Sequence, residues 1–285
     1  RDWSISRNRF WGTPIPVWKS DNPQFPRIDV FGSVAEIKEK TGIEVTNLHK
    51  PYIDEVVYPN PDDPSGKTMM RRVGDVFDCW FESGSMPYAQ VHYPFDNKEW
   101  FENHFPADFI VEAMDQTRGW FYTLLAISTL MFDKAPFKNC IVLGHVNDKN
   151  GIKMSKSKGN VVSPDDLVRD YGCDSLRMYE LFVGPPELDA EWDDRGIEGV
   201  SRFLNRFYNL VMTSKDKDIK ETKEMVKLRH KLVFDIEQRF EQFSLNTVIS
   251  GFMEYNNKLI DLAKKEGGID KETLKTFTIL LAPFA

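Results

Sequence analysis

The stretch DFIVEAMDQTRGWFYTLLAISTLMFDKAPFKNCIVLGHV, residues 108–146, carries the strongest secondary-structure signal in the chain. Residues 108–115 form a short apolar run that predicts a strand ending in a turn. Residues 117–132 are apolar on most faces, which predicts a buried helix packed on a sheet. The β-branched run at 139–146 predicts a second strand. Strand, helix and strand in this order indicate a parallel crossover, and therefore an α/β fold.

Polar residues and glycine follow both predicted strands. Residues 112–116 close the first strand, and residues 144–158 follow the second. Ligands in open parallel sheets gather at the carboxyl ends of the strands. We therefore expect the two segments to border one crevice.

Residues 151–160, GIKMSKSKGN, place Lys153, Lys156 and Lys158 within six positions, with glycine on both sides. Glycine lets backbone N–H groups approach a ligand, and lysine supplies a movable positive charge for phosphate. The like charges repel one another unless a counter-charge arrives. These residues alone favour a phosphate loop and a solvated surface turn about equally, and the GxxxxGK[ST] order of a P-loop is missing.

The segment before residue 108 predicts short extended elements. Pro14 and Pro16 exclude a helix near the start of the chain and favour strands. Residues 33–40 predict a short helix. Residues 49–68, rich in proline, glycine and aspartate, predict a loop.

The region after residue 200 predicts a helical domain, because apolar side chains recur there in three stripes at helical spacing. Gly267 and Gly268 are expected to end the third helix, and Asp270 to cap a fourth.

Composition narrows the class of protein. The 285 residues are 41% hydrophobic and 13% aromatic, enough for a sizeable core, and no apolar run reaches membrane-spanning length. The three cysteines are isolated from one another, so neither a disulfide framework nor a metal site is indicated. The net charge of −7 is uneven, because residues 201–285 are net basic, a weak sign of a polyanionic partner. We expect a soluble intracellular protein.

Four segments resemble the motifs of the class I aminoacyl-tRNA synthetases, in that family's order and spacing. They are RDWSISRNRFWG (1–12), DVFDCWFESG (75–84), MDQTRGWF (114–121) and KMSKSKGN (153–160). The resemblance covers essentially the whole chain. It implies an α/β fold, with the second half of a Rossmann-type parallel-sheet catalytic domain followed by an all-α helical bundle.

Within this family the chain is most similar to the isoleucyl enzymes of the isoleucyl, valyl and leucyl subgroup. Residues 77–95 and 115–125 resemble the isoleucyl type, whereas residues 184–211 look more leucyl-like. A leucyl enzyme and a non-catalytic RNA-binding relative therefore stay open as alternatives.

The resemblance implies roles in the lysine loop, defined as residues 151–160. Lys153 and Lys156 would hold the ATP phosphates and stabilise the charge of the leaving pyrophosphate. Ser155 and Ser157 would shape the loop and add hydrogen bonds, and Met154 would lie at the bound nucleotide.

The resemblance also implies nucleotide contacts after the two predicted strands. Gly144 and His145 would read the adenosine through backbone groups, with Asp115 and Gln116 near the ribose and the adenylate. Glu112 resembles an acidic residue that contacts the aminoacyl-adenylate. Its alternative is an ordinary carboxylate at a strand end.

Trp80 and Trp120 resemble two tryptophans that wall the isoleucine pocket. Flat aromatic walls supply apolar area and a shape that excludes larger side chains. Without the resemblance, both would be interpreted as core residues.

The resemblance divides the chain into a catalytic domain at 1–161, a connecting stem-contact module at 162–200 and part of a helical anticodon-binding domain at 201–285. The His-x-Gly-His signature that the family also uses does not occur in the sequence, and an editing domain is missing. We therefore expect a fragment of an enzyme that by itself lacks half of the ATP site and is inactive.

The implied reaction is that of a ligase with isoleucine, ATP and tRNA(Ile) as partners. Mg²⁺ would enter with ATP as its substrate complex, without a metal site in this chain. The implied location is cytoplasmic, with no membrane association.

Overall fold

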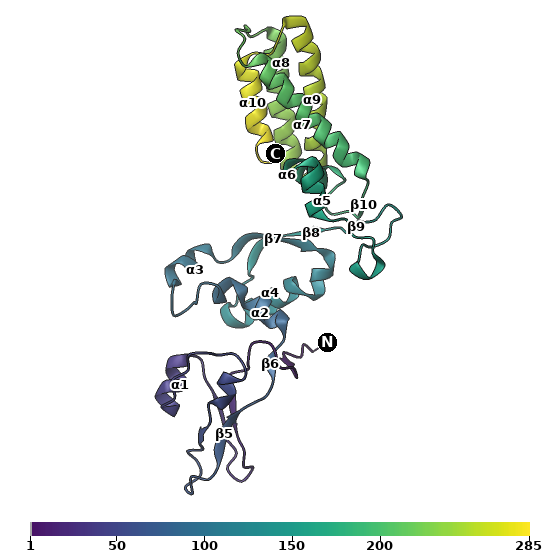
Figure 1. The fold of residues 1–285 in the computed structure, drawn as a ribbon. Helices are drawn as coiled ribbons and strands as arrows, with labels where there is room; N and C mark the ends of the chain where they lie inside the picture. Colours follow the sequence, from purple (N-terminus) through teal and green to yellow (C-terminus); the bar gives the residue numbers. More distant parts are fainter. Residues whose placement is uncertain (1) are drawn as a thin grey trace. The chain divides into compact units, whose positions relative to one another are not determined.

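The structure is a computed structural model that describes residues 2–285. The chain folds into two compact units (Figure 1). The first contains the residues up to Ile110 together with Asp115–Cys140, and the second contains Val111–Met114 together with Ile141–Ala285.

A small antiparallel sheet opens the first unit, with the strand order β3-β2-β5-β4. Its strands are β2 (Val17–Ser20), β3 (Ile28–Val30), β4 (Tyr58–Pro59) and β5 (Met69–Arg72). A second antiparallel pair joins β1 (Ser6–Arg7) to β6 (Val76–Phe77). Trp18 in β2 is fully buried, and its indole N–H donates to the Val56 carbonyl at 2.7 Å. β2 begins directly after Pro16, which confirms the extended structure predicted there.

The predicted helix at 33–40 is confirmed as α1 (Val34–Thr41). The Ser33 hydroxyl accepts the Glu36 N–H at 3.1 Å, and the Glu36 carboxylate accepts the Gly32 N–H at 2.9 Å. These two bonds satisfy amide groups that the helix itself leaves free. The segment 49–68, expected as a loop, contains a 3₁₀ turn at Tyr52–Glu55 and the two-residue strand β4.

The helices α2 (Cys79–Ala89) and α4 (Trp120–Phe132) pack with their backbones close together, while α3 (Lys98–His104) is shorter. A Cβ atom at Gly84 would lie 2.8 Å from Ile127 Cδ1 and 2.9 Å from the Thr123 carbonyl oxygen. Only glycine fits there without moving α4. The absence of a side chain at Gly84 therefore sets the separation of the two helices.

We expect Gly84→Ala to lower the free energy of unfolding of the first unit by about 1–3 kcal/mol, because the added methyl group overpacks a backbone contact. Urea unfolding followed by tryptophan fluorescence measures this, since six of the seven tryptophans lie in this unit. Gly74→Ala is the matched control, because nothing lies within 4 Å of a Cβ atom there. Equal losses in both variants would contradict the close packing.

The strands β7 (Ala107–Ala113) and β8 (Phe137–Leu143) pair with each other. The Ala107 N–H donates to the Pro136 carbonyl at 3.0 Å, and the Lys138 ammonium lies 2.8 Å from the Asp108 carboxylate. The two strands therefore begin side by side and run in the same direction. The predicted strand–helix–strand crossover is confirmed, with both strands starting one or two residues earlier than expected.

The crossover helix begins later than predicted. A 3₁₀ turn occupies Met114–Arg118, and α4 starts at Trp120 rather than at residue 117. The backbone at Gly119 has φ −137° and ψ −116°, which is not helical. Residues 117 and 118, which were predicted to be the start of the helix, therefore belong to the tight turn after β7.

The predicted buried helix is only partly buried, because one face of α4 is not covered by the described residues. Phe121, Leu124 and Ile127 are buried, whereas Leu125, Leu130 and Met131 are exposed. The exposure of Leu130 reaches 86%. The cause is that α2 and a sheet of two strands are too small to surround an apolar helix of 13 residues.

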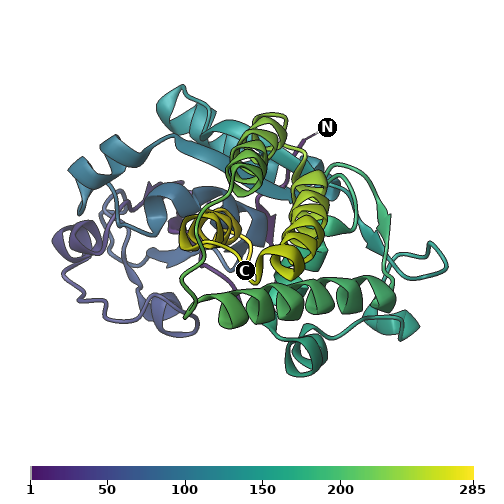
Figure 2. The same cartoon turned by 90° about the horizontal axis from the view of Figure 1, so that it is seen from above.

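The second unit is mainly helical, and Figures 1 and 2 show its last helices lying side by side. The helices are α5 (Pro164–Tyr171), α6 (Cys173–Phe182), α7 (Asp194–Ser214), α8 (Lys223–Glu241), α9 (Leu245–Glu266) and α10 (Lys271–Leu281). One apolar core joins α5 to α10, with Met225, Phe252 and Phe277 fully enclosed. The predicted helices after residue 200 are confirmed, and they share their core with α5 and α6.

The predicted boundary between the third and fourth helices of this domain is also confirmed. Gly267 ends α9 in the left-handed conformation at φ 83°. The Asp270 carboxylate accepts the Thr273 N–H at 2.9 Å and caps α10. Glycine and aspartate have these roles at helix ends because of backbone freedom and a short acceptor side chain.

Candidate active site

The two predicted pocket tryptophans come from the packed helices α2 and α4. Trp80 lies in the first turn of α2 and is 37% exposed, and its Cη2 atom would lie 3.2 Å from a Cβ atom at Gly119. Trp120 begins α4, and its indole N–H donates to the Ser83 carbonyl at 3.1 Å. Trp80 and the residue before Trp120 are thus in close proximity.

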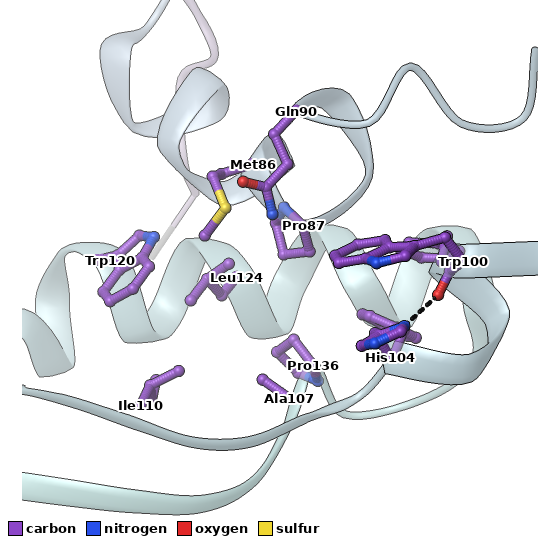
Figure 3. Close-up of a pocket in the computed structure, with 12 residues that line it drawn as sticks. Met86, Pro87, Gln90, Trp100, His104, Ala107, Ile110, Trp120, Leu124 and Pro136 are labelled. Carbon is purple, nitrogen blue, oxygen red and sulfur yellow. Dashed lines mark hydrogen bonds between the residues drawn. The ribbon is translucent and has the colours of Figure 1, made fainter. Parts of the chain in front are cut away.

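The two rings nevertheless line different hollows. Trp120 and Leu124 border an apolar cavity of about 190 Å³ (Figure 3), with Ile110 of β7 facing them. The far end of this cavity is closed by α3, where Trp100 stacks on His104 with ring centroids 4.3 Å apart. Each tryptophan therefore offers one wall, and the structure does not join the two walls in one cavity of this unit.

Trp80 lines a second hollow of about 500 Å³, whose lining includes Arg7, Asp78, Arg118 and Tyr122. Arg7 and Asp78 form an ion pair at 3.1 Å. This hollow contains charged groups of both signs beside an aromatic ring.

Gln116 fixes the turn that leads into α4. Its Oε1 atom accepts the Trp120 N–H at 2.9 Å, and its Nε2 atom donates to the Asp115 carboxylate at 3.3 Å. The first bond satisfies an amide at the start of α4 that has no partner within the helix. The structure thus brings Asp115, Gln116 and Trp120 together where the turn after β7 leads into α4.

Glu112 and Gly144 lie at the same end of the β7–β8 pair. Glu112 is the next to last residue of β7 and is exposed, and Gly144 directly follows β8. Because the two strands run in the same direction, the residues after both emerge at one edge. The two strand ends thus lie at one edge, while the shared crevice stays a prediction.

Gly144 and His145 join β8 to a second parallel pair, β9 (Val146–Asn147) with β10 (Ala190–Glu191). The Gly144 N–H donates to the Pro186 carbonyl at 2.9 Å, and the His145 N–H donates to the Asp189 carboxylate at 2.7 Å. A Cβ atom at Gly144 would lie only 2.2 Å from the Leu188 carbonyl. The absence of a side chain here allows the two backbones to meet.

We expect Gly144→Ala to destabilise the second unit by at least about 1–3 kcal/mol, because the obstructing atoms belong to the backbone and cannot rotate away. Chemical unfolding followed by circular dichroism measures the change in helix content of this unit. Gly184→Ala serves as the control, since nothing lies within 4 Å of a Cβ atom there. An unchanged midpoint for Gly144→Ala would show that the segment at Leu188 moves freely.

The lysine loop lies in the second unit as an exposed hairpin with a 3₁₀ turn at Lys156–Lys158. The side chains of Lys153, Lys156 and Lys158 are exposed, and within residues 2–285 none of them forms a hydrogen bond or ion pair. The Ser155 and Ser157 hydroxyls lie 3.2 Å apart. Three uncompensated ammonium groups on one turn suit a ligand with several negative charges.

A cavity of about 400 Å³ lies within the second unit, and its lining includes Met154 of the lysine loop. Gly144, His145 and Met154 line it, as expected for residues that contact one ligand. Glu180 of α6 and Trp192 also line it, and sequence reasoning missed both. Desolvation raises the pKa of the Glu180 carboxyl. In the sequence, Glu180 is a single carboxylate beside apolar residues of α6. This pattern is too common in helices to indicate a functional residue.

Two further classes of feature can be reported for the described residues. No group of three or more His, Cys, Asp or Glu side chains among residues 2–285 is placed to hold a metal ion. None of the helices in this part of the chain is long and apolar enough to cross a membrane.

The curated relatives with high identity are isoleucine–tRNA ligases. The enzyme of Rickettsia africae (strain ESF-5) is 65% identical over 181 residues, which cover 64% of this chain and 17% of the relative. The enzyme of Rickettsia bellii (strain OSU 85-389) is 63% identical over the same length, with 16% of the relative covered. The matched part thus spans about a sixth of the length of these relatives.

Solved structures share the fold. The LeuRS–tRNA–LeuAMS ternary complex of Agrobacterium radiobacter K84 superimposes with a TM-score of 0.78 at 23% identity, covering all of this chain and 40% of that chain. Methionyl-tRNA synthetase of Mycobacterium tuberculosis bound by methionyl-adenylate gives a TM-score of 0.58 at 14% identity, covering 74% of this chain and 48% of that chain.

A family model decides the relationship. Residues 1–193 match the family described as tRNA synthetases class I (I, L, M and V). The match includes all four motifs that the sequence analysis singled out, together with β7, α4, β8 and the lysine loop. The chain belongs to the class I tRNA synthetases of the I, L, M and V group.

Proposed function

We propose that the full-length protein is an isoleucine–tRNA ligase, which activates isoleucine with MgATP and transfers it to tRNA(Ile). The observation that carries the activation step is the exposed lysine loop with three ammonium groups that have no anionic partner among residues 2–285. The choice of isoleucine is supported by the 65% identity to isoleucine–tRNA ligases.

In the first step the carboxylate of isoleucine attacks the α-phosphorus of ATP. A new O–P bond forms, the bond between the α-phosphorus and its bridging oxygen breaks, and pyrophosphate leaves. Lys153 and Lys156 stabilise the negative charge that accumulates on the departing phosphates, and no protein nucleophile is needed. Mg²⁺ enters and leaves with the phosphates as part of the substrate.

In the second step a terminal ribose hydroxyl of tRNA attacks the carbonyl carbon of the adenylate, and AMP leaves. We assign adenylate contacts to Glu112, Asp115 and Gln116. The adenosine contacts go to Gly144, His145 and Met154. Support for the latter group comes from the cavity of about 400 Å³ that all three line. Ser155 and Ser157 add hydrogen bonds at the phosphates.

We assign contacts with the isoleucine side chain to Trp80 and Trp120, whose rings line separate hollows of the first unit in this structure. Two observations support this assignment: Trp80 is exposed, and a hydrogen bond holds the Trp120 ring against α2. Two rigid aromatic walls discriminate by shape, since an apolar pocket offers few other contacts. A cytoplasmic location belongs to the same proposal, because charging of tRNA serves translation.

Lys156→Ala in the full-length protein should lower kcat for isoleucine-dependent pyrophosphate exchange by about 10²–10³-fold, because a positioned charge is removed from the transition state. The dissociation constant of isoleucine should change little, since the amino acid does not contact the loop. Lys149→Ala provides the control, as Lys149 is an exposed lysine outside the motif. Similar losses in kcat and in isoleucine affinity would contradict this role for Lys156.

Pyrophosphate exchange with isoleucine, valine and leucine at equal concentrations tests the amino acid. Isoleucine should give the highest kcat/KM, with valine about 10–200-fold lower because one methylene group is worth about 1–3 kcal/mol. Leucine should be disfavoured by its branching. A preference for leucine would identify a leucyl enzyme. Exchange with none of the three would identify a non-catalytic relative.

A further inference from the structure

Asp148 closes the turn that precedes the lysine motif. Its Oδ1 atom accepts the N–H groups of Asn150 and Ile152, both at 2.9 Å. The Asp148 N–H donates to the Ile152 carbonyl at 2.9 Å, and Gly151 takes the left-handed conformation at φ 71°. One carboxylate oxygen is therefore fully used in shaping the first half of the hairpin.

The second carboxylate oxygen reaches across to the far end of the loop. The Asn160 Nδ2 atom donates to Asp148 Oδ2 at 2.8 Å, although the two residues are 12 positions apart. The Asn160 Oδ1 atom accepts the Ser155 N–H at 2.9 Å, and its Nδ2 atom lies 3.4 Å from the Lys153 carbonyl. One side-chain amide thus ties the aspartate to the backbone on both sides of Met154.

This pair of residues, the Asp148–Asn160 clamp, opposes a repulsion. Lys153, Lys156 and Lys158 carry like charges on a short segment, and their mutual repulsion favours an open loop. The clamp instead holds the backbone beside Lys153 and Ser155 in place before any phosphate arrives. The hydrogen bonds from Asn160 and Ile152 lower the pKa of the Asp148 carboxyl, which keeps it ionised and able to accept at neutral pH.

We propose that Asp148 and Asn160 are positioning residues that pre-form the lysine loop for the triphosphate of ATP. This inference rests on the proposed function. A charge that is already in place costs no reorganisation when pyrophosphate leaves, and a displacement of about 1 Å can cost about 10²-fold in rate. Neither residue touches the phosphates, and the clamp acts through the backbone that carries the lysines.

The clamp can be tested by exchanging its two ends in the full-length protein. Asn160→Asp keeps the acceptor for the Ser155 N–H but places two carboxylates against each other. We expect it to lower kcat for pyrophosphate exchange by about 10–100-fold, with KM for isoleucine unchanged. The double variant Asp148→Asn with Asn160→Asp again pairs one amide with one carboxylate, and it should recover most of the lost rate.

Asn150→Asp is the matched control, because it adds the same charge to the same exposed turn and keeps the backbone N–H that Asp148 accepts, without changing the side chain of Asp148 or Asn160. It should leave kcat unchanged. Hydrogen exchange of peptides covering residues 148–160 gives a reading independent of activity: it should accelerate in Asn160→Asp and return towards wild type in the double variant.

The outcomes separate the two proposals. A wild-type protein without exchange activity would overturn the proposed function, and this inference with it. An active wild type in which Asn160→Asp matches Asn150→Asp would overturn the clamp alone. The clamp would also be overturned if the double variant did not recover the rate lost in Asn160→Asp, because the two residues would then act separately. Equal rises in KM for isoleucine and falls in kcat would indicate general damage and reject a positioning role.

Discussion

The common direction of β7 and β8 is the constraint on which the rest of the site depends. The two strands begin side by side, held by the Ala107–Pro136 hydrogen bond and the Asp108–Lys138 ion pair. Strands of equal length that start together also end together. Glu112 and Gly144 therefore emerge at one edge, and each chain segment that follows starts from a fixed point. A parallel pair requires a crossover, which α4 supplies.

Two glycines convert this scaffold into close backbone contacts. Gly84 lets α2 approach α4, and this contact places Trp80 beside the turn that Gln116 organises. Gly144 lets the chain after β8 meet the segment at Leu188, which aligns β9 with β10. In both places the tolerance is smaller than one methyl group, because the neighbouring atoms include backbone that cannot rotate away. At both glycines the absence of a side chain sets how closely the two backbone segments approach each other.

The lysine loop carries its negative charge at the base and its positive charges at the exposed tip. Both carboxylate oxygens of Asp148, at the base of the lysine loop, accept amide N–H groups, whereas Lys153, Lys156 and Lys158 form no ion pair within residues 2–285. Asp148 thus shapes the loop without neutralising Lys153 or Lys156 through an ion pair. Had it paired with a lysine, it would compete with phosphate for the same charge. A loop with a hydrogen-bonded carboxylate at its base and exposed ammonium groups at its tip is suited to an anionic ligand.

The sequence by itself determined the strand–helix–strand order, the parallel crossover, the short helix α1, the boundary at Gly267 and Asp270, and the family motifs. These features depend on local periodicity, on capping chemistry and on short runs of residues. Only the tertiary structure decided the start of α4 at Trp120, the exposed face with Leu130, the separate hollows of Trp80 and Trp120, the place of Glu180 and the link between Asp148 and Asn160. Each of these depends on which surfaces meet across many residues of chain, and local propensity contains no information about such distant partners.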